Sequence, residues 1–197
     1  MTIPGSNFCA VMFLIEIHIQ CMLVERYADK LEQGAQHWIK LEGGEDFDGE
    51  AAPIDILAWC TVCLAAMAAI RRLVVAGESN PRANRRRVAL KNLLGDPELP
   101  CLSSALVRNS WEHLDDRLDR ILPSLTQGTL SHIHVAATPP KPNAIALKRF
   151  DPVNFVVHFV TDAVPLRARI EEVKDLRQRI DRAMVRLQTE TIDVWSA

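Results

Sequence analysis

A chain of 197 residues and 22.1 kDa has the size of one ordinary domain, which argues against a multidomain enzyme and predicts a single domain over residues 1–197. Its 48% hydrophobic and 24% charged residues, with a mean hydropathy of +0.01, argue against a disordered chain and against a membrane-embedded bundle. The formal net charge of -2 provides no overall field that would attract nucleic acid or an anionic membrane.

Stretches of helical periodicity, separated by clusters of Gly, Pro, Asn and Asp, predict three helices in the first half of the chain. The first is expected from about residue 7 to residue 41, where the acidic segment GGEDFDGE ends it. The second begins near Pro53, a residue suited to the first helical turn, and ends before GESNP at 77–81. A third, shorter helix is expected over 82–94, with Gly95 as its C-cap.

The second half of the chain predicts two more helices and a hairpin. A fourth helix is expected over 103–122, because its apolar residues alternate at spacings of four and three. The proline-rich segment 123–144 is expected to be a long loop. AIALKRF and NFVVHFV then predict a β-hairpin over about 145–161 with its turn at 150–153, and the last helix, about 166–190, is strongly amphipathic.

Together these elements predict a mainly all-α fold, an up-down bundle of about five helices with one small β-hairpin before the C-terminal helix. The low aromatic content of 6% agrees with a helical chain.

Cysteine usage predicts a reduced, cytoplasmic protein, because the five cysteines are an odd number and the start of the chain lacks the basic segment of a secretory signal. The longest apolar run, 56–70, has 15 residues, short of the roughly 20 that span a bilayer, and predicts a buried helix. Cys60 and Cys63 form a CxxC motif in this run, but no second pair stands at metal-binding spacing, so packing is favoured over zinc. No membrane, metal or cofactor is expected.

Polar groups are dense within the fourth predicted helix, where the sequence reads RNSWEHLDDRLDR from residue 108. Asn109 and His113 are four residues apart and share a helix face, whereas Arg108 lies about 140° from His113 around the axis. One copy of the helix therefore does not form a tight Arg–His pair. An isologous interface across a two-fold axis would bring two arginines and two histidines to one cleft, which would suit RNA.

Arg108, Asn109 and His113 resemble the signature of the HEPN superfamily, in which an arginine followed by a polar residue precedes a histidine by five to seven positions. The resemblance implies an all-helical homodimer whose two motifs face each other, and metal-independent ribonuclease activity. Some members are toxins paired with a nucleotidyltransferase antitoxin, so the resemblance also implies such a partner. The subfamily that is neutralised by tyrosine modification has a tyrosine two residues after the histidine, where this chain has Asp115.

The three residues fit cleavage of RNA without a metal, because the 2'-hydroxyl of RNA is itself the nucleophile. His113 would take the 2'-proton or protonate the leaving 5'-oxygen. Arg108 would hold the non-bridging phosphate oxygens as charge develops, and Asn109 would hydrogen-bond the phosphate or orient the imidazole. The expected product end is a 2',3'-cyclic phosphate.

Two alternatives stay open at this point. Arg108 and Glu112 are also an ordinary i,i+4 ion pair, and the same helix would then belong to a non-catalytic dimerisation or interaction module. The basic stretch either follows an RNA backbone or forms a solvated helix face. Its candidate substrate-binding residues, with one from the fourth helix, are Arg82, Arg85, Arg86 and Arg117.

A further pair, His132 and His134 in the predicted loop, has the form HxH. No acidic or cysteine partner lies near it in sequence, so it does not predict a metal site.

Overall fold

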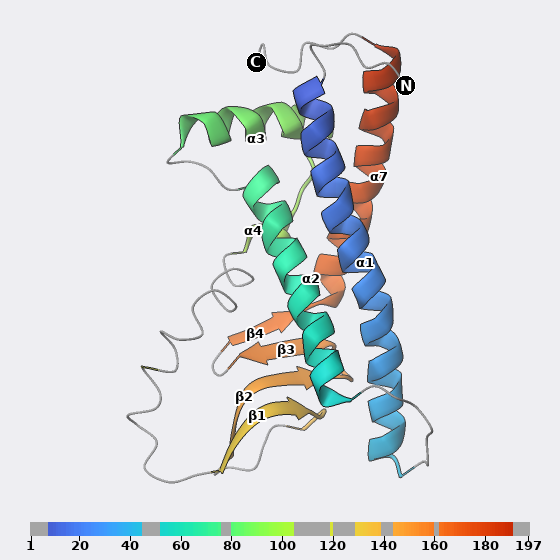
Figure 1. Ribbon diagram of the computed structural model, residues 1–197, viewed down its shortest axis with the longest axis vertical. Helices are drawn as coiled ribbons and strands as arrows, with labels where there is room; N and C mark the ends of the chain where they lie inside the picture. The colour runs from blue at the N-terminus through green and yellow to red at the C-terminus, as the bar shows by residue number, and fades with distance from the viewer. Residues whose placement is uncertain are drawn as a thin grey trace. The chain divides into compact units, whose positions relative to one another are not determined.

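The computed structural model describes residues 8–44, 52–75, 80–104, 119, 129–138, 144–159 and 162–190. Within them the protein is mostly helical and carries one mixed four-stranded sheet, which confirms the mainly helical class (Figure 1). The elements in chain order are α1 (Phe8–Glu42), α2 (Pro53–Val74), α3 (Pro81–Leu93), α4 (Pro100–Ser103), β1 (Thr129–Val135), β2 (Ala144–Asp151), β3 (Val156–Phe159), β4 (Asp162–Pro165) and α7 (Arg167–Thr189).

Four of the five predicted helices correspond closely to α1, α2, α3 and α7, with ends that differ by about three residues or fewer. The fourth predicted helix, 103–122, lies almost wholly outside the described residues. The structure describes only its beginning, where α4 ends at Ser103, and residue 119.

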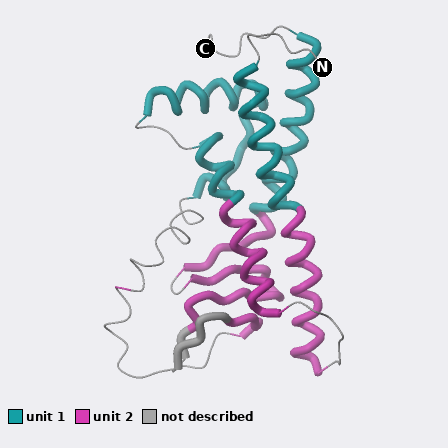
Figure 2. The backbone as a smooth tube through the Cα atoms, viewed as in Figure 1, with its two compact units in different colours: residues 1–25, 66–104, 169–197 teal, residues 26–65, 105–168 magenta. Residues whose placement is uncertain are grey.

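The chain divides into two compact units (Figure 2). The first comprises residues 1–25, 66–104 and 169–197, and the second comprises residues 26–65 and 105–168, so α1, α2 and α7 contribute to both. In the first unit α7 buries one apolar residue in every three or four, as its sequence predicts. The ion pairs Glu25–Arg177, at 3.0 Å, and His18–Asp181, at 3.6 Å, lie beside this core.

The second unit contains the sheet, whose strands lie in the order β1-β2-β3-β4. β1 runs parallel to β2, and the other two pairs are antiparallel. One cross-strand row is fully apolar and buried, and consists of Val135, Phe150, Val157 and Val164. The apolar face of the sheet is therefore set by strand register.

Two sequence expectations are wrong in this region. The predicted loop 123–144 contains β1, which extends the expected hairpin of about 145–161 into a four-stranded sheet together with β4. The loop was expected because the segment has no helical period, and a parallel partner strand leaves no local signal in the sequence. The turn also falls later than 150–153, because Asp151 still pairs with Val156. Asp151 Oδ1 accepts from Val153 N and Asn154 N, at 3.0 and 2.9 Å, which forms the turn two residues further on.

By length and composition alone α1 and α2 could each cross a membrane. The helix α2 has 22 residues and is longer than the 15-residue apolar run 56–70 that it contains. Core helices of soluble proteins share this property, and half of the apolar window of α2 is buried inside the protein. The observation does not assign the protein to a membrane.

Candidate functional site

The basic stretch of the chain forms α3, which begins with a defined N-cap. Asn80 Oδ1 accepts from the backbone N–H of Arg82 at 3.0 Å and of Ala83 at 3.3 Å, and Pro81 occupies the first turn. Ala89, Leu90 and Leu93 are buried and attach the far end of the helix to the first unit. The arginines of α3 are thus presented by a capped and anchored helix.

These arginines have different surroundings. Arg82 and Arg85 are exposed. Arg86 is held in place, because its Nη2 donates to the Arg72 carbonyl at 3.2 Å and its guanidinium lies 5.2 Å from the centre of the Phe13 ring. Arg87 Nη2 donates to Asn84 Oδ1 at 2.8 Å, a neutral acceptor that leaves the charge of Arg87 in place. Arg117, the fourth predicted substrate-binding residue, lies outside the described residues.

The segment after α3 turns sharply through two residues with positive φ, Gly95 at 72° and Asp96 at 47°. The Asp96 N–H donates to the Lys91 carbonyl at 2.7 Å, and Lys91 Nζ lies 2.8 Å from Asp96 Oδ1. The hydrogen bond and the charge of Lys91 hold the pKa of the Asp96 carboxyl below its usual value. This turn places a cation and an anion next to each other at the end of the basic helix.

The short helix α4 follows, and it is held by a carboxylate from α7. Glu172 Oε1 and Oε2 accept from the N–H groups of Cys101 and Leu102, each at 2.8 Å, and so cap the N-terminus of α4. Arg71 Nε donates to the Ser103 carbonyl at 3.2 Å. Because α4 has only four residues, these contacts largely determine its position.

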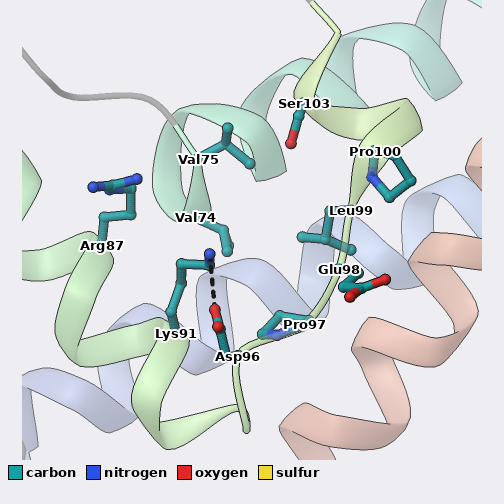
Figure 3. Close-up of a pocket in the computed structure, with 10 residues that line it drawn as sticks. All are labelled: Val74, Val75, Arg87, Lys91, Asp96, Pro97, Glu98, Leu99, Pro100 and Ser103. Carbon is teal, nitrogen blue, oxygen red and sulfur yellow. Dashed lines mark ion pairs between the residues drawn. The ribbon is translucent and has the colours of Figure 1, made fainter.

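The end of α2, the helix α3, this turn and α4 surround a cavity of about 420 Å³ (Figure 3). It is lined by Val74, Val75, Arg87, Lys91, Asp96, Pro97, Glu98, Leu99, Pro100 and Ser103. In Figure 3 the Ser103 hydroxyl points into the space between the lining residues, on the side opposite the Lys91–Asp96 pair. The volume is in the range of small-molecule sites.

The chemistry of the cavity is mixed. Its two cations, Arg87 and Lys91, stand beside an apolar surface of valines, prolines and Leu99. The Asp96 side chain is 75% exposed, so solvent screens its pairing with Lys91. The carboxylate of Glu98 also lines the cavity, so its two cations are matched by two anions, and the combination suits a small ligand with polar and apolar parts. Sequence reasoning identified the basic helix but missed the cavity, whose other walls come from the segment 96–103.

The predicted catalytic residues Arg108, Asn109 and His113 lie outside the described residues. Ser103, on the cavity wall, precedes Arg108 by five residues.

A second polar cluster lies on the sheet and was not predicted. The register places His134, Arg149 and His158 in one cross-strand row. Arg149 is buried, its Nη1 donates to the Ala136 carbonyl at 3.1 Å, and its Nη2 lies 2.7 Å from His158 Nε2. Burial, together with the charge of Arg149, lowers the pKa of His158. The predicted hairpin would not have shown this contact, because its turn at 150–153 places position 149 opposite 154, whereas the observed register pairs Arg149 with His158.

The cysteines of the CxxC motif are buried in α2 as free thiols. Burial raises the pKa of Cys63 to about 12 and that of Cys60 well above its ordinary value, so both remain protonated. Among the described residues no group of three or more His, Cys, Asp or Glu side chains is placed to hold a metal ion. Of the HxH pair, His134 is half-buried and the His132 side chain lies outside the description.

Comparisons with family models, with curated proteins and with solved structures return no match for this chain.

Proposed function

We propose that the protein is a metal-independent endoribonuclease of HEPN type. The observation that carries the proposal is the motif of Arg108, Asn109 and His113, with its resemblance to the HEPN signature. In this proposal the helices form an up-down bundle that works in the cytoplasm as a homodimer, with the two motifs at a shared cleft. A defence or toxin–antitoxin role, with a nucleotidyltransferase-type partner, belongs to the same proposal.

The basic end of the first unit supports an RNA substrate. Arg82 and Arg85 are exposed on α3, and Arg87 and Lys91 line the neighbouring cavity. Lys and Arg at such positions contact phosphates and contribute affinity without reading sequence. The cavity would hold one nucleotide of the strand.

In the proposed reaction His113 removes the 2'-hydroxyl proton, and the 2'-oxygen attacks the adjacent phosphorus. Arg108 stabilises the negative charge on the non-bridging oxygens, and Asn109 holds the phosphate or the imidazole. The bond from phosphorus to the 5'-oxygen breaks, and that oxygen receives a proton, from the second His113 of the dimer. The products are a 2',3'-cyclic phosphate and a 5'-hydroxyl end.

The test is incubation of the purified protein with mixed RNA in EDTA, next to Arg108→Ala and His113→Ala variants. Circular dichroism and gel filtration first establish that the variants keep their fold and oligomeric state. We expect cleavage by the wild type and a loss of at least about 100-fold in each variant, the scale of general acid–base catalysis. Lys174→Ala, an exposed cation on α7, is the control and should cleave normally. Equal cleavage by all four proteins would contradict the proposal.

A second candidate is the non-catalytic interaction module, and one observation favours it. The N-terminal half of α1 exposes large apolar side chains. Phe8 and Met12 are each more than half exposed. Absence of wild-type cleavage on diverse RNAs, with an intact fold, would favour this alternative.

A further inference from the structure

The helix α1 has two apolar faces in its N-terminal half. One is buried in the first unit and includes Leu14, Ile17, Cys21 and Val24, at spacings of three and four. The other is an exposed series with the same spacings, which we call the α1 stripe, and consists of Phe8, Met12, Ile15, Ile19 and Met22. Because each residue advances about 100° around a helix, the two series lie on opposite sides of α1. The second face has no partner among the described residues.

The α1 stripe is well exposed and narrow. Its side chains range from 36% exposed for Ile15 to 56% for Phe8. Polar groups border it on both sides: Glu16 accepts a hydrogen bond from Gln20 at 2.8 Å, and His18 lies 3.6 Å from Asp181. A helix intended for lipid would present a broad apolar surface, whereas a stripe one residue wide with polar borders suits contact with another helix.

We propose that the α1 stripe is a dimer interface, in which α1 packs against α1 of a second copy as a short antiparallel coiled coil. Spacings of four and three over five positions give the seam that coiled-coil partners share. A second copy carries the same seam, and a two-fold axis makes such a surface complementary to itself. The partner of the α1 stripe is thus α1 of a second copy, which has the same apolar repeat.

Charge determines the direction of the two helices. Residues 8–25 contain no Lys or Arg, so the stripe itself carries no cation that would repel a second copy. The same spacing continues at Arg26 and Asp29, both exposed, which end the stripe. A parallel pair would bring Arg26 next to its own counterpart. An antiparallel pair places Met12 beside Met22 and Ile15 beside Ile19 of the other copy, and brings Arg26 to Phe8, where the cation can lie on the ring.

The size of the stripe sets the strength of the dimer. Five partly exposed side chains provide on the order of a few hundred Å² of apolar surface. A standard stable interface buries roughly 800 Å² per partner. We therefore expect a dimer that dissociates in the micromolar range. This interface goes beyond the proposed nuclease function, whose own dimer is expected at Arg108 and His113. Contact through the α1 stripe is a separate step of association with its own Kd.

Sedimentation equilibrium of the full chain over about 1 to 200 µM tests the interface. We expect the mass of the wild type to double with rising concentration, from monomer to dimer or, where the motif already joins two copies, from dimer to tetramer. The variant Ile15→Glu/Ile19→Glu should raise the Kd of this step at least tenfold. Both side chains are exposed, so the variant should keep its fold, which circular dichroism verifies. Val185→Glu is the matched control, because Val185 is 60% exposed on α7 of the same unit. A wild type whose mass does not change with concentration, or a doubling step that Ile15→Glu/Ile19→Glu weakens no more than Val185→Glu does, overturns the proposal.

Cross-linking tests the direction in a Cys9→Ser background, since Cys9 is exposed near the stripe. A mixture of Met12→Cys and Met22→Cys chains should form the mixed disulfide when oxidised, with little of either homodimer. Homodimers of Met12→Cys alone would overturn the antiparallel arrangement. Flotation with vesicles of neutral and anionic phospholipid tests whether the α1 stripe binds a lipid surface instead of a second copy. Binding to vesicles that Ile15→Glu/Ile19→Glu abolishes, from a wild type whose mass does not change with concentration, would identify a lipid surface and overturn the second copy.

Discussion

At the scale of single residues, the contact between Arg149 and His158 requires a neutral imidazole. Nη2 of Arg149 lies 2.7 Å from His158 Nε2, so Arg149 donates and the ring nitrogen accepts. Asp151, 4.0 Å from Arg149 Nη1, opposes the effect by raising the pKa of His158, but burial and Arg149 outweigh it. The folded protein therefore binds a proton at His158 less readily than the unfolded chain does.

This difference predicts a loss of stability in mild acid. The unfolded histidine titrates near pH 6.5 and the folded one at a lower pH, so the unfolded state binds more protons between the two values. The stabilisation is complete above about pH 6.5 and is lost as the pH falls toward the folded pKa. Urea unfolding at pH 7.5 and 5.5 should show a larger loss for the wild type than for His158→Gln, whose amide oxygen still accepts but does not titrate. Equal losses would show that His158 does not cause the pH dependence.

Arg149 also shows that the burial of a charged residue cannot be read from the sequence. Arg149 stands in a predicted strand, where one charged residue in an apolar segment is normally taken as solvent-facing. Its partners in the interior are the carbonyl of Ala136, which directly follows the unpredicted strand β1, and His158 on β3. A buried charge of this kind is identified by its partners and not by its neighbours in sequence.

At the scale of elements, periodicity predicted the long helices and failed for the sheet. The helix α7 follows its apolar repeat from Arg167 to Thr189 because that repeat is satisfied within one segment. The strand β1 is stabilised by parallel pairing with β2, and no local sequence pattern encodes this register. The strand β4 has four residues, too few to show alternation. Local signals thus found the helices, and long-range pairing determined the remainder.

The cap on α4 gives a prediction at this scale. Glu172→Ala removes two charge-assisted hydrogen bonds and leaves the N–H groups of Cys101 and Leu102 without their acceptor. We expect the free energy of unfolding to fall by about 1.5 to 3 kcal/mol, as measured by urea denaturation. The adjacent Glu171 is exposed and pairs with exposed Lys174, so Glu171→Ala should cost about 0.5 kcal/mol or less. A similar cost for both substitutions would mean that Glu172 does not fix α4.

The turn after α3 gives another prediction at the scale of elements. Gly95 has a φ of 72°, and a Cβ there would meet only Arg179 Nη1, at 3.6 Å. Gly95→Ala therefore has space but acquires backbone strain, which we expect to cost about 1 to 2 kcal/mol of unfolding free energy. Asn92→Ala, an exposed position in the last turn of α3, is the control and should change stability little. An unchanged midpoint for Gly95→Ala in urea would mean that this turn relaxes.

At the scale of the whole molecule, the net charge of -2 means that any affinity for RNA must come from local cations. The largest local excess of bases over acids is in the segment 71–91, which has seven bases and one acid, whereas residues 1–55 have three bases and ten acids. Long-range attraction is then weak, and binding depends on the few phosphates that touch the basic region. The dependence of the RNA affinity on salt concentration therefore measures the number of phosphate contacts.

Each phosphate contact to single-stranded nucleic acid contributes a slope of about -0.7 to the plot of log affinity against log salt concentration. Arg82 and Arg85 are exposed on α3, so Arg82→Ala/Arg85→Ala should weaken binding and flatten this slope by about 1.4. Fluorescence anisotropy with a labelled 2'-O-methyl oligonucleotide measures the slope without cleavage, because the nucleophile is blocked. Lys174→Ala/Arg186→Ala removes two exposed cations from α7 and should leave the slope unchanged. If both double variants flatten it equally, the cations act through net charge alone, and α3 is not where the strand binds.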